Sequence, residues 1–153
     1  MKKHTGSWEG VMIHHSAGRQ TDTVASIRAL HKAKGWGDIG YHYVLEIKDG
    51  RGFLKAGRST EYAGAHAGLA YYNNRYLGLC VPGNYETQEL PAAVYADLVG
   101  AVAHLAKKYD APKVLGHREV KPTACPGKHM PLVALRNEVQ ERLRKARERE
   151  TKK

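Results

Sequence analysis

The hydrophobic positions in the first third of the chain predict a strand and then a helix. Residues 10–16, GVMIHHS, form a short apolar run that ends in polar residues. This pattern is typical of a buried strand, with His14 and His15 at its carboxyl end. Residues 21–37, TDTVASIRALHKAKGWG, begin with capping residue types, place apolar residues at helical spacing and then reach a glycine. We expect a helix there.

The next segment alternates with a period of two. Within residues 39–57, tyrosine, leucine and isoleucine alternate from Tyr41 to Ile47 with His42, Val44 and Glu46, ahead of an Asp-Gly turn signal. This predicts a β-hairpin. Residues 59–74 are rich in glycine, alanine and polar residues without a clear period, which predicts a loop.

The second half repeats the alternation of strands and helices. We expect a buried strand at 76–81, a helix at 90–109 with Pro91 in its first turn, and a short strand at 113–117. Residues 131–153 predict an amphipathic, basic closing helix, whose inward positions are Leu132, Leu135, Val139 and Leu143. Beyond Leu143 the apolar stripe thins, so a solvated, frayed tail is expected.

These elements predict one α/β domain over residues 1–153, with its core at about 10–140. A central mixed sheet should be flanked by helices. The length of 153 residues and the 42% hydrophobic content fit one globular domain, and no apolar run is long enough to suggest a membrane span. The start, MKKHTGSWEG, lacks the apolar stretch of a secretory signal, so we expect synthesis in the cytoplasm.

The formal net charge of +10 indicates an anionic partner. Residues 136–153 hold eight Lys or Arg against four Glu, a net of +4. Nucleic acid and an anionic bacterial envelope both fit such a charge. No RRM, zinc-finger or helix-turn-helix signature accompanies it, so no nucleic acid partner is expected.

The two cysteines have different surroundings. Cys80 lies in the apolar run YLGLCV and is expected in the core, reduced. Cys125 lies in GHREVKPTACPG, eight residues after His117. Zinc binds imidazole and thiolate ligands, and catalytic sites have three protein ligands. The third would come from His14 or His15, which point to opposite faces of a strand, and alternation alone does not choose between them.

Five motifs occur together in one order: VMIHHSAG, GWGDIGYHYVL, AGAHAG, YNNRYLGL and LGHREVKPTACPG. In order and approximate spacing they resemble the zinc-dependent N-acetylmuramoyl-L-alanine amidases of the bacteriophage T7 lysozyme type. They are also similar to the peptidoglycan recognition proteins, which share that fold. The resemblance covers about residues 10–140 and implies a zinc site in a groove on one side of the domain.

Position by position, the resemblance implies one Zn²⁺ per chain with His14, His117 and Cys125 as ligands. Tyr41 matches a catalytic tyrosine of the family. The alternative for Tyr41 is a half-buried strand aromatic with no role in the reaction.

The resemblance also concerns the substrate groove. His66 matches a histidine that lines it, and Asn73 lies in a stretch that flanks it, although His66 can equally be a loop histidine without a role. Thr123 stands where the T7-type enzymes have a catalytic lysine and the catalytic recognition proteins usually have threonine. Thr123 is therefore a candidate catalytic residue or a turn-shaping one. Lys121 and Lys128 are nearby, but neither aligns with that lysine.

The resemblance implies a peptidoglycan hydrolase that cuts the amide bond between N-acetylmuramic acid and L-alanine, as a phage endolysin does. Such an enzyme would be made in the host cytoplasm and act at the wall after membrane disruption, as a monomer without a separate wall-binding domain. Two alternatives are a cytoplasmic muropeptide-recycling amidase and a non-catalytic peptidoglycan-binding module. The binding modules generally lack the cysteine ligand, so Cys125 favours catalysis.

Overall fold

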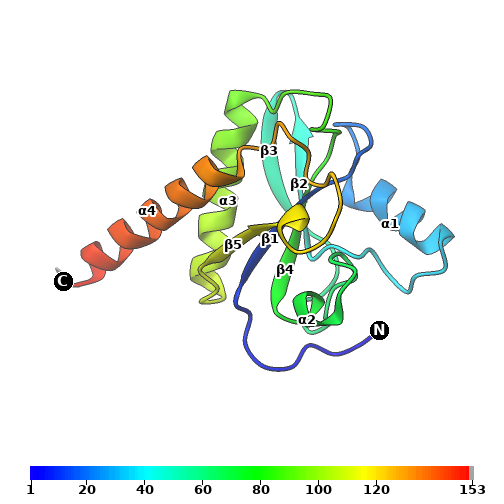
Figure 1. Ribbon diagram of the computed structural model, residues 1–153, viewed down its shortest axis with the longest axis horizontal. Helices are drawn as coiled ribbons and strands as arrows, with labels where there is room; N and C mark the ends of the chain where they lie inside the picture. The colour runs from blue at the N-terminus through cyan, green and yellow to red at the C-terminus, as the bar shows by residue number, and fades with distance from the viewer. Residues whose placement is uncertain (152–153) are drawn as a thin grey trace.

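A five-stranded mixed sheet forms the centre of the computed structural model, which describes residues 1–151 (Figure 1). The strands are β1 (Gly10–His15), β2 (Tyr43–Lys48), β3 (Arg51–Ala56), β4 (Tyr76–Val81) and β5 (Lys113–Gly116). Their order across the sheet is β3-β2-β4-β1-β5. Neighbouring strands are parallel except in the β2–β3 hairpin, so the predicted mixed sheet is confirmed.

Helices cover both faces of this sheet. They are α1 (Val24–Ala33), α2 (Ala70–Asn73), α3 (Ala92–Lys108) and α4 (Leu132–Thr151), with a 3-10 turn, η1 (His117–Glu119), directly after β5. Figure 1 shows α3 and α4 on one side of the sheet and α1 on the other, with α4 projecting from the body. The expected α/β architecture, a sheet flanked by helices, is therefore confirmed.

The central strands β1 and β4 are buried along their whole length, because helices cover both of their faces. Side chains alternate between two apolar clusters. Tyr43 and Val81 belong to the larger cluster against α3 and α4, whereas Val44 and Cys80 belong to the smaller cluster with α1. The prediction that Cys80 lies in the core is confirmed, since its side chain is fully buried.

The helix predicted in residues 21–37 begins where its capping residues place it. The Thr23 hydroxyl accepts the Ser26 N–H, and the Ser26 hydroxyl accepts the Thr23 N–H in return. After the last turn Gly35 adopts a φ of +92°, a conformation that favours glycine.

Two segments differ from the prediction. The loop expected at 59–74 contains the one-turn helix α2. Earlier in the same loop, Tyr62 forms an isolated antiparallel bridge with Lys3. Tyr41 and His42, expected inside the hairpin strand, precede β2. There the Gly57 N–H and the Arg58 N–H donate to the carbonyls of His42 and Tyr41, but the His42 N–H donates to the Gly78 carbonyl of β4. The regular β2–β3 ladder therefore starts only at Tyr43.

The frayed tail expected beyond Leu143 is wrong for residues 144–151, which remain helical. Arg144 pairs with Glu141 and Glu148, one turn away on either side, and such pairs stabilise an exposed helix. Positions 152–153 of the predicted tail lie outside the described residues. Across the part of the chain that the structure describes, no helix is long and apolar enough to cross a membrane.

Candidate metal centre

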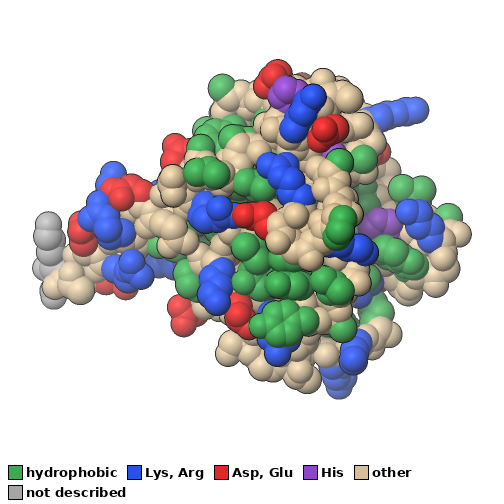
Figure 2. Space-filling model, in the orientation of Figure 1, with side chains coloured by type: hydrophobic (Ala, Val, Ile, Leu, Met, Phe, Trp, Pro, Cys, Tyr) green, Lys and Arg blue, Asp and Glu red, His purple; other side chains and the backbone are tan. Residues whose placement is uncertain are grey.

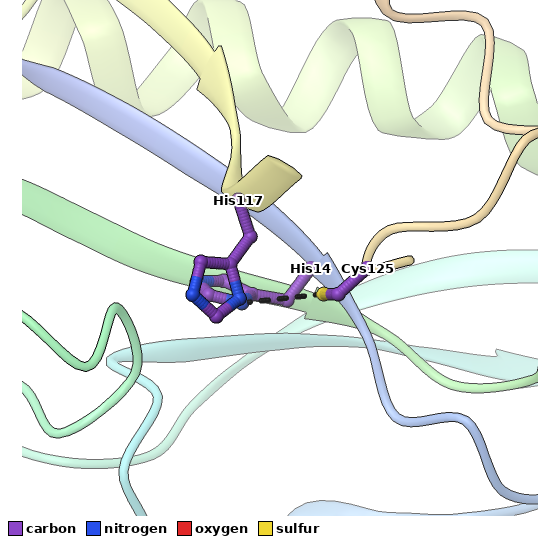
Figure 3. Close-up of side chains that lie close together, drawn as sticks. All are labelled: His14, His117 and Cys125. Carbon is purple, nitrogen blue, oxygen red and sulfur yellow. Dashed lines mark hydrogen bonds between the residues drawn. The ribbon is translucent and has the colours of Figure 1, made fainter. Parts of the chain in front are cut away.

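The candidate metal centre lies where two parallel strands end side by side. Ile13 of β1 is opposite Gly116 of β5, so the next residues, His14 and His117, are neighbours at the same edge of the sheet. Their ring centroids are 4.7 Å apart. Cys125 reaches the same point from the loop that follows η1, and Figure 3 shows the three side chains converging.

The loop that carries Cys125 is closed on itself by Arg118. The backbone N–H of Arg118 donates to the Cys125 carbonyl at 2.9 Å, and its guanidinium donates to the Gly127 carbonyl. These bonds bring the two ends of the GHREVKPTACPG segment together. Although His117 and Cys125 are eight residues apart in the sequence, their ligand atoms therefore lie within 4.8 Å of each other, which the spacing alone did not reveal.

The donor set fits a tetrahedral metal ion. One ligand atom each from His14, His117 and Cys125 lie within 4.8 Å of one another. The His14 Nδ1 atom is 3.5 Å from the Cys125 sulfur. With Zn–N near 2.0–2.1 Å and Zn–S near 2.3 Å, a tetrahedral angle places nitrogen and sulfur about 3.5 Å apart. Two imidazoles and one thiolate are also ligands that zinc prefers.

The sheet separates His14 from His15. In the β1–β4 register His14 lies beside Cys80 and His15 beside Val81, which belong to the clusters on opposite faces. His14 therefore faces the α1 side, where Cys125 approaches. His15 turns toward α3, and its Nδ1 atom accepts the Tyr85 N–H at 3.1 Å.

Each candidate histidine ligand uses one ring nitrogen inside the protein. The His117 Nε2 atom lies 2.9 Å from the Ala67 carbonyl oxygen, which can only accept a hydrogen bond. The His14 Nε2 atom lies 2.8 Å from the Nδ1 atom of His66. In both residues this leaves Nδ1 as the atom available to a metal.

Burial controls the protonation of the three side chains. Burial, reinforced by His66 and His117, lowers the pKa of His14 well below its ordinary value, and burial also lowers the pKa of His117. Both imidazoles are therefore neutral at pH 7, as metal ligands must be. Burial raises the pKa of the Cys125 thiol to about 11, against the opposing effects of the His15 N–H and Arg118. A cation is required to hold Cys125 as a thiolate at neutral pH.

Tyr41 stands beside this centre, with its ring centroid 5.1 Å from that of His14. Burial and the nearby thiols of Cys80 and Cys125 raise the pKa of the phenol well above its ordinary value. The hydroxyl therefore stays protonated and can donate a hydrogen bond, but it does not act as a base at neutral pH.

An open groove of about 440 Å³ has His117 in its lining. His66 and Asn73, the two predicted substrate contacts, both line it, together with Trp36 and Lys121. His66 is only 7% exposed, and both of its ring nitrogens bond within the protein, so it offers no free polar atom to a substrate. Lys121 lines the groove although it does not align with the family's lysine.

Thr123, the other predicted catalytic residue, is exposed in the loop before Cys125. Its hydroxyl oxygen accepts the Cys125 N–H at 3.3 Å, a contact that shapes the turn. The hydroxyl proton is not used in that bond, so Thr123 keeps one donor for another group.

The chain is similar in sequence to known proteins. The family model Amidase_2, described as N-acetylmuramoyl-L-alanine amidase, matches residues 4–128. The endolysin of Escherichia phage T7 is 32% identical over an alignment of 132 residues, which covers 81% of this chain and 83% of the endolysin.

Solved structures are similar as well. The amidase LysC from Clostridium intestinale URNW is 26% identical, with a TM-score of 0.76 over 92% of this chain and 93% of that one. A mutant of Drosophila PGRP-LB in complex with tracheal cytotoxin is 27% identical, with a TM-score of 0.72 over 88% of this chain and 83% of that chain.

Proposed function

The chain belongs to the Amidase_2 family of N-acetylmuramoyl-L-alanine amidases, and we propose that it cleaves peptidoglycan with a zinc ion held by His14, His117 and Cys125. The bond cut is the amide between N-acetylmuramic acid and L-alanine. The observation that carries the zinc proposal is the convergence of the three ligand atoms within 4.8 Å of one another. All three come from one chain, so the site is complete in a monomer.

The chemistry divides between the metal and the surrounding side chains. A zinc ion bound there supplies Lewis acidity, which polarises the scissile carbonyl and makes hydroxide available from water at neutral pH. Tyr41 donates a hydrogen bond to the oxygen that gains negative charge. Thr123, in the loop that carries Cys125, has a hydroxyl proton available for a second hydrogen bond. Asn73 and Lys121 line the groove in which the stem peptide would lie.

A non-catalytic binding module is the weaker alternative. The relatives include peptidoglycan-recognition proteins as well as endolysins, so the fold alone does not separate catalysis from binding. The complete His, His and Cys donor set supports hydrolysis, because binding a muropeptide requires no such set.

Digestion of purified peptidoglycan tests this function. We expect free muramic lactyl ends and new L-alanine amino termini in equal amounts, and no new reducing sugar ends. A chelator should abolish the release, and added Zn²⁺ should restore it. Release that persists after complete removal of metal would contradict the zinc proposal.

We also propose that the basic surface attracts the enzyme to an anionic bacterial envelope. The projecting helix α4 carries Lys and Arg interleaved with Glu (Figure 2). Arg144 and Lys145 pair within the helix, whereas Arg147 and Arg149 have no ion-pair partner within residues 1–151. Such unpaired cations are free to interact with phosphate and carboxylate groups.

We expect the rate of lysis of permeabilised cells to fall several-fold as salt rises from about 20 to about 200 mM, because the Debye length shortens severalfold. Cleavage of a small soluble muropeptide should change little. The double variant Arg147→Gln, Arg149→Gln should lose about 3–10-fold on cells at low salt. The matched control, Lys48→Gln, Lys55→Gln on the β2–β3 hairpin, removes the same charge elsewhere. An equal loss in both variants would assign the effect to net charge and not to α4.

A further inference from the structure

The segment His66–Ala67 contacts both candidate histidine ligands. The His66 ring bonds His14, and the Ala67 carbonyl accepts a hydrogen bond from His117. Building on the proposed zinc site, we propose that His66 is a positioning residue, which sets the tautomer of His14 so that its Nδ1 lone pair points at the metal. His66 would thus act on the metal through His14, and not on the substrate.

The Tyr76 carbonyl oxygen, at the end of the hydrogen-bonded chain, determines which atom donates in each bond. The His66 Nε2 atom lies 2.9 Å from the carbonyl oxygen of Tyr76, and a carbonyl oxygen can only accept. His66 therefore carries its proton on Nε2. The ring is 7% exposed and bonds only the Tyr76 carbonyl and the His14 ring, so a second proton would leave a buried charge without a counter-ion. In the neutral ring the Nδ1 atom is an acceptor.

The acceptor on His66 determines where the neighbouring His14 ring carries its proton. Because His66 Nδ1 accepts, the His14 Nε2 atom 2.8 Å away must be the donor. A neutral His14 then has its lone pair on Nδ1, the atom that lies 3.5 Å from the Cys125 sulfur. The chain from Tyr76 through His66 to His14 fixes one of two otherwise similar tautomers. A histidine ligand oriented in this way binds metal more tightly.

The His66 ring has little freedom to adopt another orientation. A Cβ atom added at Gly64 or Gly78 would lie 2.4 or 2.5 Å from the ring's Cδ2 atom, so the ring fills a slot that only two glycines leave open. Asn73 fixes the backbone of the same segment, because its Oδ1 atom accepts the N–H groups of His66 at 3.0 Å and Ala67 at 2.8 Å. One amide side chain thereby positions the contacts to both ligands.

Metal affinity provides the first test. Titration of metal-free protein with Co²⁺, followed by its visible absorption, measures binding without any activity assay. We expect His66→Phe, which keeps a ring but removes both nitrogens, to weaken Co²⁺ binding by about 10–100-fold. His66→Gln retains an amide donor and acceptor and should recover part of that loss.

The matched control is His42→Gln. His42 is also fully buried and also bonds at both nitrogens, to the Tyr62 carbonyl and the Gly78 N–H, but it hydrogen-bonds neither candidate histidine ligand. It should lose stability and keep wild-type Co²⁺ affinity. A folded His66→Phe protein that binds Co²⁺ like wild type would overturn the proposal. Failure of the wild type itself to bind Co²⁺ would instead overturn the zinc site.

A measurement on the wild type needs no variant. Long-range ¹H–¹⁵N NMR spectra of metal-free protein distinguish the two imidazole tautomers. We expect the Nε2–H form for His14, His66 and His117. A His14 ring protonated on Nδ1 would overturn the proposal even where His66→Phe does not fold.

Discussion

Replacing Cys125 by serine is expected to lower kcat/KM for peptidoglycan cleavage by at least about 10³-fold, or about 4 kcal/mol of transition-state stabilisation. Serine keeps the size of the side chain but does not ionise to an alkoxide at neutral pH. The site would keep two imidazoles, His14 and His117, and lose its only anionic ligand. Zinc bound so weakly would dissociate at catalytic enzyme concentrations.

The measurement is the release of L-alanine amino termini from purified peptidoglycan, with bound zinc determined on the same samples. Cys80→Ala is the matched control, because Cys80 is the chain's other cysteine and is fully buried beside His14 in the β1–β4 register. It should cost stability, on the order of 1 kcal/mol, and keep its zinc. Full activity in Cys125→Ser would exclude the cysteine as a required ligand.

Most of the secondary structure could be predicted from the sequence, because the central strands and the main helices have clear local patterns of apolar and capping residues. The runs 10–16 and 76–81 became β1 and β4, and the capping residues near Thr23 placed the start of α1. Such signals depend only on neighbours along the chain. The choice between His14 and His15 could not be made from such signals, because it depends on which helix covers which face of the sheet.

The environment of His66 shows why the rest could not be predicted. The resemblance to the amidases implies that His66 lines the substrate groove, and its side chain does line the groove beside His117. Its hydrogen bonds, however, go to Tyr76 and His14, which lie 10 and 52 residues away, and its slot requires Gly78. These partners meet only when β1 and β4 pair, so no pattern within the motif reveals them.

Hydrogen bonds and packing hold the backbone and ring of Tyr41 in place, so removal of its hydroxyl should leave the surrounding structure unchanged. The buried guanidinium of Arg58 donates to the carbonyls of Ile39 and Ala63, and the Arg58 N–H donates to the Tyr41 carbonyl. The ring also packs against the α1 cluster. Tyr41→Phe retains these contacts and removes only the hydroxyl, which also hydrogen-bonds the buried Cys80 side chain.

We expect Tyr41→Phe to lower kcat on a soluble muropeptide by about 10²–10³-fold, the usual loss when one donor to a developing oxyanion is removed. KM and Co²⁺ affinity should stay within about twofold, because binding of substrate and metal does not require the hydroxyl. Tyr43→Phe is the control, since that hydroxyl bonds Tyr109 at 2.7 Å on the opposite face of the sheet. Wild-type kcat in Tyr41→Phe would reduce Tyr41 to a packing residue, and a matching loss of Co²⁺ affinity would make it a support for the metal instead.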